Sequence, residues 1–163
     1  MLTYHQIPVS ISLISIDLPL WHTFKTDATL EQKDQQRFHL LLNEPAPPEW
    51  KPKLAKDGNC HQPKSESSRF LWLEISPYRV SMTMQEQGKL SYRHLWQQGV
   101  YGVSRYCLQK DSLEGYRSLQ LRNYTRSVEL DGCPVPHNLR LEYELWSEKF
   151  RLGHYILHLQ IEH

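Results

Sequence analysis

The chain has 163 residues, enough for one domain with a substantial core, and its 19 Lys and Arg nearly balance its 18 Asp and Glu. This balance excludes a uniformly basic protein that binds nucleic acids or membranes through net charge alone. Three scattered cysteines without a C-x-x-C pair exclude a disulfide framework and a zinc ribbon. The apolar stretch at 7–21 is broken by Pro8, Asp17 and Pro19, so we expect neither a signal peptide nor a membrane helix, and a cytoplasmic location.

Two elements are predicted before residue 44. Residues 9–16 are predicted to form a strand, because apolar and polar side chains alternate over its first half. Residues 26–43 are predicted to form the one long helix, with a polar capping residue at its start and Leu30 and Phe38 in its apolar stripe. Asp34 lies where that stripe needs an apolar side chain, so the stripe is thin.

A proline-rich loop is predicted at about 45–68. Five prolines in this stretch fix the backbone and remove amide donors, which excludes the interior of a helix or sheet. Loops of this length are either binding loops or unspecialised excursions. Trp50 and the Cys60-His61 pair keep the first alternative open.

Residues 69–131 are predicted to form an antiparallel meander. Residues 70–75 are apolar at nearly every position, which predicts a strand covered on both faces. Farther along, the apolar phase changes from odd positions (Leu119) to even positions (Val128), which predicts a β-bulge between about Asn123 and Ser127.

The C-terminal quarter carries the clearest pattern in the chain. Apolar side chains alternate with polar ones over residues 138–146 and again over 154–162. A period of two is typical of antiparallel strands with one buried face. The sequence therefore predicts a mainly β (β-rich α+β) single domain over 1–163, with about eight antiparallel strands in a barrel or sandwich and one helix near 26–43.

Catalytic and metal-binding patterns are weak. No nucleophile elbow, phosphate-binding glycine loop or H-E-x-x-H motif is present. His154 and His158 share a strand face but lie about 13 Å apart, too far to ligate one ion. Glu142 and Glu144 share a face with Arg140, which favours a solvated charge ladder over an acid–base pair. The sequence thus favours a non-enzymatic protein with no catalytic residue, metal or cofactor.

A basic and aromatic sheet face is the strongest functional feature. Residues 69–126 carry nine Lys and Arg against four Asp and Glu, whereas residues 127–163 carry three against six. Arginine with tyrosine is typical of protein interfaces and also of RNA-binding sheets. We expect an accessory subunit that docks on a larger protein assembly or, alternatively, an RNA-contacting subunit of a ribonucleoprotein such as a CRISPR-type effector complex. The predicted contact residues are Arg93, Tyr101, Arg105, Tyr106, Arg122, Tyr124 and Arg126.

The predicted architecture allows a third function. A barrel of about eight strands at this length is compatible with a lipocalin-like protein that binds or attaches a small hydrophobic ligand. An ordinary packed core is the other interpretation of the same pattern. The residues expected to line such a cavity are Trp72, Met82, Met84, Tyr92, Trp96 and Tyr143.

Overall fold

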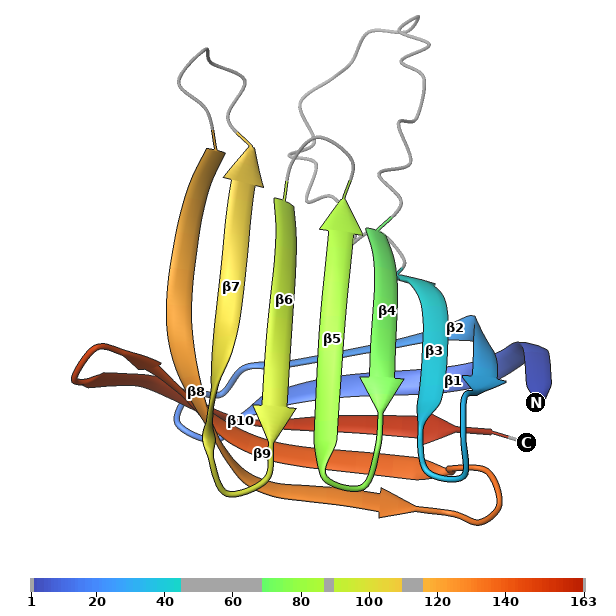
Figure 1. The fold of residues 1–163 in the computed structure, drawn as a ribbon. Coiled ribbons are helices and arrows are strands. Elements are labelled where there is room, and N and C mark those ends of the chain that lie inside the picture. Colours follow the sequence, from blue (N-terminus) through green and yellow to red (C-terminus); the bar gives the residue numbers. More distant parts are fainter. Residues whose placement is uncertain (1, 45–68, 87–89, 110–115, 163) are drawn as a thin grey trace, which may run out of the picture.

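The computed structural model describes residues 2–44, 69–86, 90–109 and 116–162. These residues form ten antiparallel strands that close into a barrel (Figure 1). The strands are β1 (Thr3–Ser15), β2 (Trp21–Gln32), β3 (Phe38–Glu44), β4 (Arg69–Ile75), β5 (Arg79–Glu86), β6 (Leu90–Gln97), β7 (Tyr101–Gln109), β8 (Tyr116–Asp131), β9 (Asn138–Ser147) and β10 (Phe150–Ile161).

Strand order follows the chain, and the barrel closes where β1 pairs with β10. Figure 1 shows β4–β7 running steeply across the direction of β1 and β10. The long strand β8 bends between these two walls, because it first pairs with β7 and then with β9. A register shift between Thr125 and Ser127 marks the bend, which confirms the predicted bulge. An extra residue in one strand bends it and changes the side chain that points inward.

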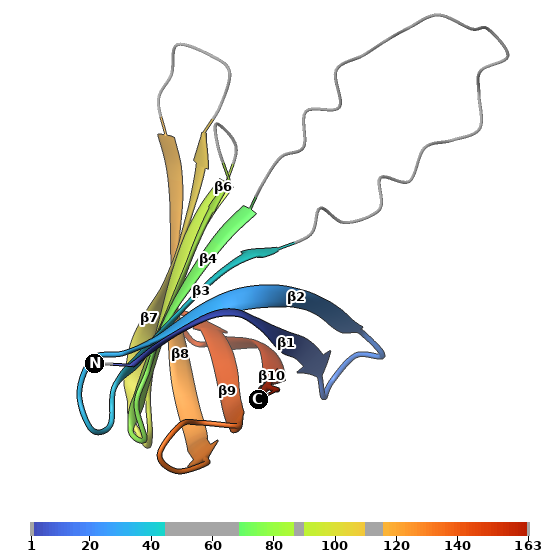
Figure 2. The same ribbon diagram turned by 90° about the vertical axis from the view of Figure 1, so that its right-hand side faces the viewer.

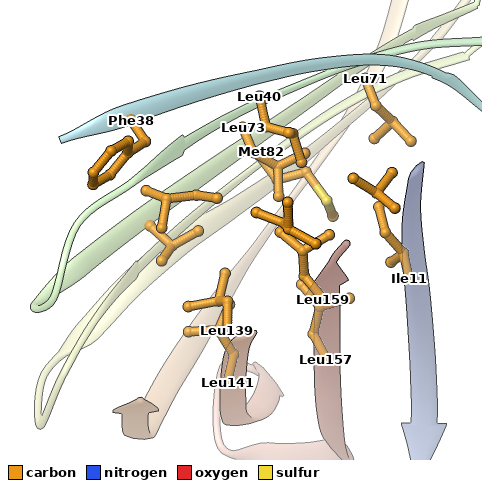
Figure 3. Packing of buried hydrophobic residues seen from close by; sticks show 14 of the residues in the cluster. Ile11, Phe38, Leu40, Leu71, Leu73, Met82, Leu139, Leu141, Leu157 and Leu159 are labelled. Atoms are coloured by element: carbon orange, nitrogen blue, oxygen red, sulfur yellow. The ribbon is translucent and has the colours of Figure 1, made fainter. Parts of the chain in front are cut away.

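The core lies between the two walls and follows the period of two (Figure 3). Along β9 and β10 the inward side chains include Leu139, Leu141, Leu157 and Leu159, and none of them is more than 3% exposed. Leu139 lies opposite Leu159 in the ladder, so the predicted C-terminal hairpin is confirmed in strand type and in face. Burying one such leucine contributes roughly 1.5–3 kcal/mol to the free energy of folding, so these four side chains are a major source of stability for β9 and β10.

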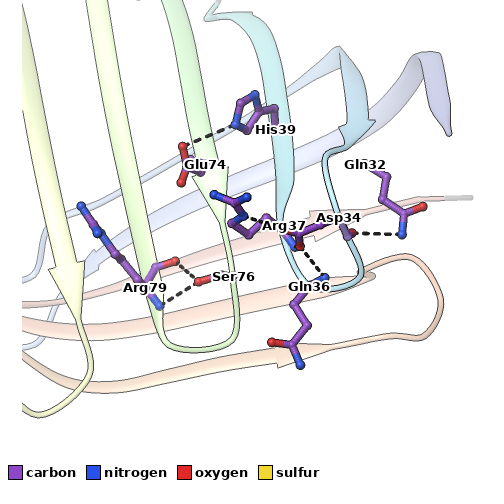
Figure 4. Close-up of polar contacts among 8 residues, drawn as sticks. All are labelled: Gln32, Asp34, Gln36, Arg37, His39, Glu74, Ser76 and Arg79. Atoms are coloured by element: carbon purple, nitrogen blue, oxygen red, sulfur yellow. Dashed lines mark hydrogen bonds and ion pairs between the residues drawn. The ribbon is translucent and has the colours of Figure 1, made fainter. Parts of the chain in front are cut away.

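The predicted helix at 26–43 is wrong, since these residues form the end of β2 and most of β3. Asp34, the residue that interrupted the apolar stripe, organises the turn between the two strands (Figure 4). Its Oδ1 accepts hydrogen bonds from the amides of Gln36 and Arg37 at 2.9 and 2.8 Å. Aspartate commonly fixes turns in this way. Leu30 and Phe38, predicted as one helical stripe, are instead buried on the inner faces of separate strands.

Two further predictions need correction. The described residues form ten strands rather than about eight, because the expected helix contributes two of them. Strand β4 is covered on its inner face only, since Phe70 and Trp72 point outward and are 41% and 45% exposed. The proline-rich stretch lies outside the described residues. In the described part of the chain, no helix has the length and hydropathy needed to cross a membrane.

Candidate ligand-binding site

A cavity of about 320 Å³ lies inside the barrel. Inward positions on eight of the ten strands form its wall, so it exists only in the closed barrel. Its lining residues are Ile11, Leu13, His22, Phe24, Leu71, Met82, Tyr92, His94, Tyr106, Tyr143, Leu145, Tyr155 and Leu157.

Aliphatic and aromatic side chains make up most of this wall. Four tyrosines, Tyr92, Tyr106, Tyr143 and Tyr155, lie at inward positions on β6, β7, β9 and β10. The rings of Tyr92 and Tyr106 lie 5.9 Å apart, and those of Tyr143 and Tyr155 lie 5.6 Å apart. The cavity therefore offers flat apolar faces with a few phenolic hydroxyls, a surface suited to a small and mainly apolar molecule.

His94 is the buried imidazole of this wall, at 5% exposure. Its Nδ1 lies 2.7 Å from the Oγ of Ser104, and this oxygen accepts a hydrogen bond of 2.9 Å from the Nδ2 of Asn123. The ring of Trp96 stacks on the imidazole, with centroids 4.8 Å apart. Burial lowers the pKa of His94 to about 4, so the imidazole is neutral at neutral pH.

The second ring nitrogen of His94 is directed toward Tyr106. The distance from Nε2 to the tyrosine hydroxyl is 3.4 Å, at the long end of the range for a hydrogen bond. Burial raises the pKa of Tyr106 to about 12 and also raises that of Tyr143. Both phenols therefore keep their protons at neutral pH, and no Asp, Glu, Lys or Arg among the described residues lines the cavity.

The first half of β2 forms part of the rim of this cavity. Pairing between β2 and β3 starts at Ala28 and Leu42, whereas residues 21–27 have ladder partners on β1 alone among the described residues. Figure 2 shows β1 and β2 diverging from β3 and β4 on this side of the barrel. His22 and Phe24 extend from this segment into the cavity wall.

The residues of the predicted basic and aromatic face lie on both sides of the barrel wall, most of them outside and one inside. Arg93, Arg105 and Arg122 are exposed on the outer face of β6, β7 and β8. Tyr101 and Tyr124 are opposite each other in the same outer ladder, with ring centroids 5.0 Å apart. The remaining two predicted residues are Arg126, which lies outside and pairs with Glu144 at 3.4 Å, and Tyr106, which points into the cavity.

Two of these arginines oppose each other without a counter-charge. Arg93 is the direct cross-strand partner of Arg105, and neither forms an ion pair with a described carboxylate. The guanidinium of Arg122 lies 5.4 Å from the ring centroid of Tyr101 and donates to the carbonyl of Glu148 at 2.6 Å. Like charges directly opposite in a sheet are destabilising, so an anionic group bound beside Arg93 and Arg105 would offset their repulsion.

Three of the six predicted cavity residues line the cavity, namely Met82, Tyr92 and Tyr143. Met84 and Trp96 are buried in the core elsewhere, and Trp72 points outward. His94 was missed as a site residue. The signal was available, because Tyr92, His94 and Trp96 occupy alternate positions of one strand and must share its inner face.

The carboxylates at 142 and 144 pair with basic side chains, as the sequence predicted, although only one of them is open to solvent. Glu142 lies 3.6 Å from Arg140 and 2.9 Å from the Nε2 of His154. Glu144 pairs with Arg126 on the same outer surface. The predicted charge pairs are therefore present, but Glu144 is buried at 7% exposure, so the ladder is not solvated along its whole length.

Comparison with known proteins identifies the architecture only. No family model matches the chain, and no curated protein matches it in sequence. The crystal structure of the ywiB protein from Bacillus subtilis is similar, with a TM-score of 0.59 and 12% sequence identity. The match covers 97% of this chain and 94% of that one, so the whole barrel is shared. At this identity the similarity concerns the fold alone.

Proposed function

We propose that the protein is a barrel that binds a small, largely apolar molecule in its interior. The cavity of about 320 Å³ carries this proposal, since a core packed to the usual density leaves no void of that size. An apolar cavity of about 150 Å³ suffices for benzene, so this one has room for a two-ring aromatic molecule.

Binding should follow the hydrophobic effect. Aliphatic side chains such as Leu13 and Leu157 would lose water-exposed area when a ligand enters, and flat rings would stack on the tyrosines. A negative heat-capacity change on binding is the expected thermodynamic signature.

Naphthalene tests this proposal by equilibrium dialysis against the purified protein. Leu13→Trp places an indole in the cavity and should abolish retention, whereas the matched variant Ile14→Trp, on the outer face of the same strand, should retain the probe like wild type. Failure of wild type to retain naphthalene, or equal retention by both variants, would contradict an interior site.

A second candidate function rests on the opposed guanidinium groups of Arg93 and Arg105. They support docking of the outer face of β6–β8 on an acidic surface of a larger protein assembly, with RNA as the alternative ligand. The double variant R93A/R105A should lose a partner that co-purifies with wild type. If nuclease also removes that partner, and if the variant flattens the salt dependence of RNA binding, the RNA alternative is supported. Unchanged co-purification by the double variant would refute docking through this pair.

A further inference from the structure

We propose that the cavity selects an uncharged ligand bearing a carbonyl or similar acceptor oxygen, which His94 Nε2–H and the Tyr106 hydroxyl bind together. This inference rests on the proposed function and adds the chemical class of the ligand. Its three supports are the uncharged lining, the proton arrangement around His94, and the position of Tyr106 beside the same ring nitrogen.

The lining disfavours a charged ligand. Among the described residues, only tyrosines and histidines accompany the apolar side chains of the cavity wall, and no Asp, Glu, Lys or Arg does. A carboxylate or ammonium group that left water for this site would find no counter-charge, and its desolvation would oppose binding strongly. A neutral oxygen needs only hydrogen-bond donors.

The bonds around Ser104 assign the proton of His94. The Oγ of Ser104 accepts from Asn123, and its remaining described side-chain partner is the Nδ1 of His94. In the proposed arrangement the single hydroxyl proton of Ser104 is donated to Nδ1, so that nitrogen is the acceptor. In a neutral imidazole the ring proton then lies on Nε2, the nitrogen directed at Tyr106.

Tyr106 supplies the second donor. Its hydroxyl lies 3.4 Å from Nε2, so the two groups are neighbours without a short bond between them. Because Nε2–H and the phenolic O–H are adjacent on the cavity wall, one acceptor oxygen placed between them can receive both. Ser104 and Asn123, each 0% exposed, hold the imidazole in this orientation as positioning residues.

Two nearly isosteric probes separate this inference from the proposed function. 2-Acetylnaphthalene carries the carbonyl oxygen, and 2-isopropenylnaphthalene replaces that oxygen with a methylene group. We expect the preference for the ketone over the alkene, measured by equilibrium dialysis, to fall roughly three- to tenfold in Tyr106→Phe, which corresponds to one net hydrogen bond. His94→Gln should lower the same ratio. Tyr101→Phe, on the outer face of the same strand as Tyr106, is the matched control and should leave it unchanged.

The outcomes are distinguishable. Retention of neither probe by wild type would overturn the proposed function itself. Binding of both probes with a ratio that Tyr106→Phe and His94→Gln leave unchanged would overturn the assigned donors and leave the cavity as a binding site. 2-Naphthoate that binds at pH 8 as tightly as 2-acetylnaphthalene would overturn the selection for uncharged ligands.

Discussion

Acidification should destabilise the fold through His94. In the folded protein, burial beneath Trp96 and among the tyrosines lowers the pKa of His94 to about 4, whereas the unfolded chain takes up this proton near the ordinary value of 6.5. Between these two pH values the unfolded state binds more protons than the folded state. Its free energy therefore falls relative to the folded state as the pH falls.

The size of this effect follows from the two pKa values. The contribution of neutral His94 to stability is complete above pH 6.5 and is lost progressively down to about pH 4. Linkage over that interval corresponds to about 3 kcal/mol of unfolding free energy. This is a large fraction of the 5–15 kcal/mol that is typical of whole domains.

Urea denaturation at several pH values between 4 and 7, followed by tryptophan fluorescence, measures this loss. His94→Gln removes the titrating ring and keeps an amide that can bond Ser104. Subtracting the pH profile of this variant from that of wild type therefore removes the contribution of the carboxylates and the other histidines to the unfolding free energy. We expect the wild-type free energy to fall by about 3 kcal/mol more than that of the variant.

Parallel pH profiles for the two proteins would refute this reasoning. An NMR titration of wild type gives an independent check that does not depend on the variant folding. The His94 ring signal should stay constant from pH 7 to pH 5. Movement of that signal with a midpoint near 6.5 would show that the ring is accessible to water.

Two further changes test the backbone and the outer surface. Gly102→Ala should lower the unfolding free energy measured by urea denaturation by about 3 kcal/mol, because the added Cβ would overlap the carbonyl oxygen of Leu95. Gly99 has a φ of +75° and open space around it, so Gly99→Ala should lower the unfolding free energy by only about 1 kcal/mol. Equal losses in the two variants would contradict the steric argument. Arg105→Glu should stabilise the protein by about 0.5–1 kcal/mol at low salt by pairing with Arg93, with the gain shrinking in 0.5 M NaCl. A thermal midpoint that does not rise would show that the two guanidiniums do not repel each other.

Alternation made the β architecture predictable. In β9 and β10 apolar side chains at alternate positions face the core, and the phase change in the sequence of β8 predicts the position of its bulge. The error at 26–43 arose because Leu30 and Phe38 also fit a helical spacing. The turn at Asp34 separates the two strands, and the hydrogen bonds that its side chain accepts from the backbone cannot be inferred from the spacing of apolar residues.

The site was less predictable than the fold. Arg105 and Tyr106 were assigned to one surface, yet adjacent residues of a strand point to opposite faces, and Tyr106 points inward. The cavity also depends on eight strands whose relative placement no local pattern specifies. The hydrogen-bonded set of His94, Ser104 and Asn123 joins three strands that are adjacent in the barrel, so its members are separated by 10 and 19 residues along the chain.

The one-sided pairing of β2 over residues 21–27 gives the barrel a seam among its described strands. Widening the barrel here breaks no described β2–β3 ladder pair, and of the described side-chain bonds between these strands it breaks the one from Thr26 Oγ1 to the carbonyl of Asn43 at 3.1 Å. A ligand could therefore exchange by a local opening that needs far less free energy than global unfolding. Amide hydrogens along this segment should therefore exchange with solvent faster than those of β9, which is paired on both sides. A bound ligand that contacts Phe24 would slow that exchange, so deuterium uptake at the seam reports occupancy of the cavity from outside it.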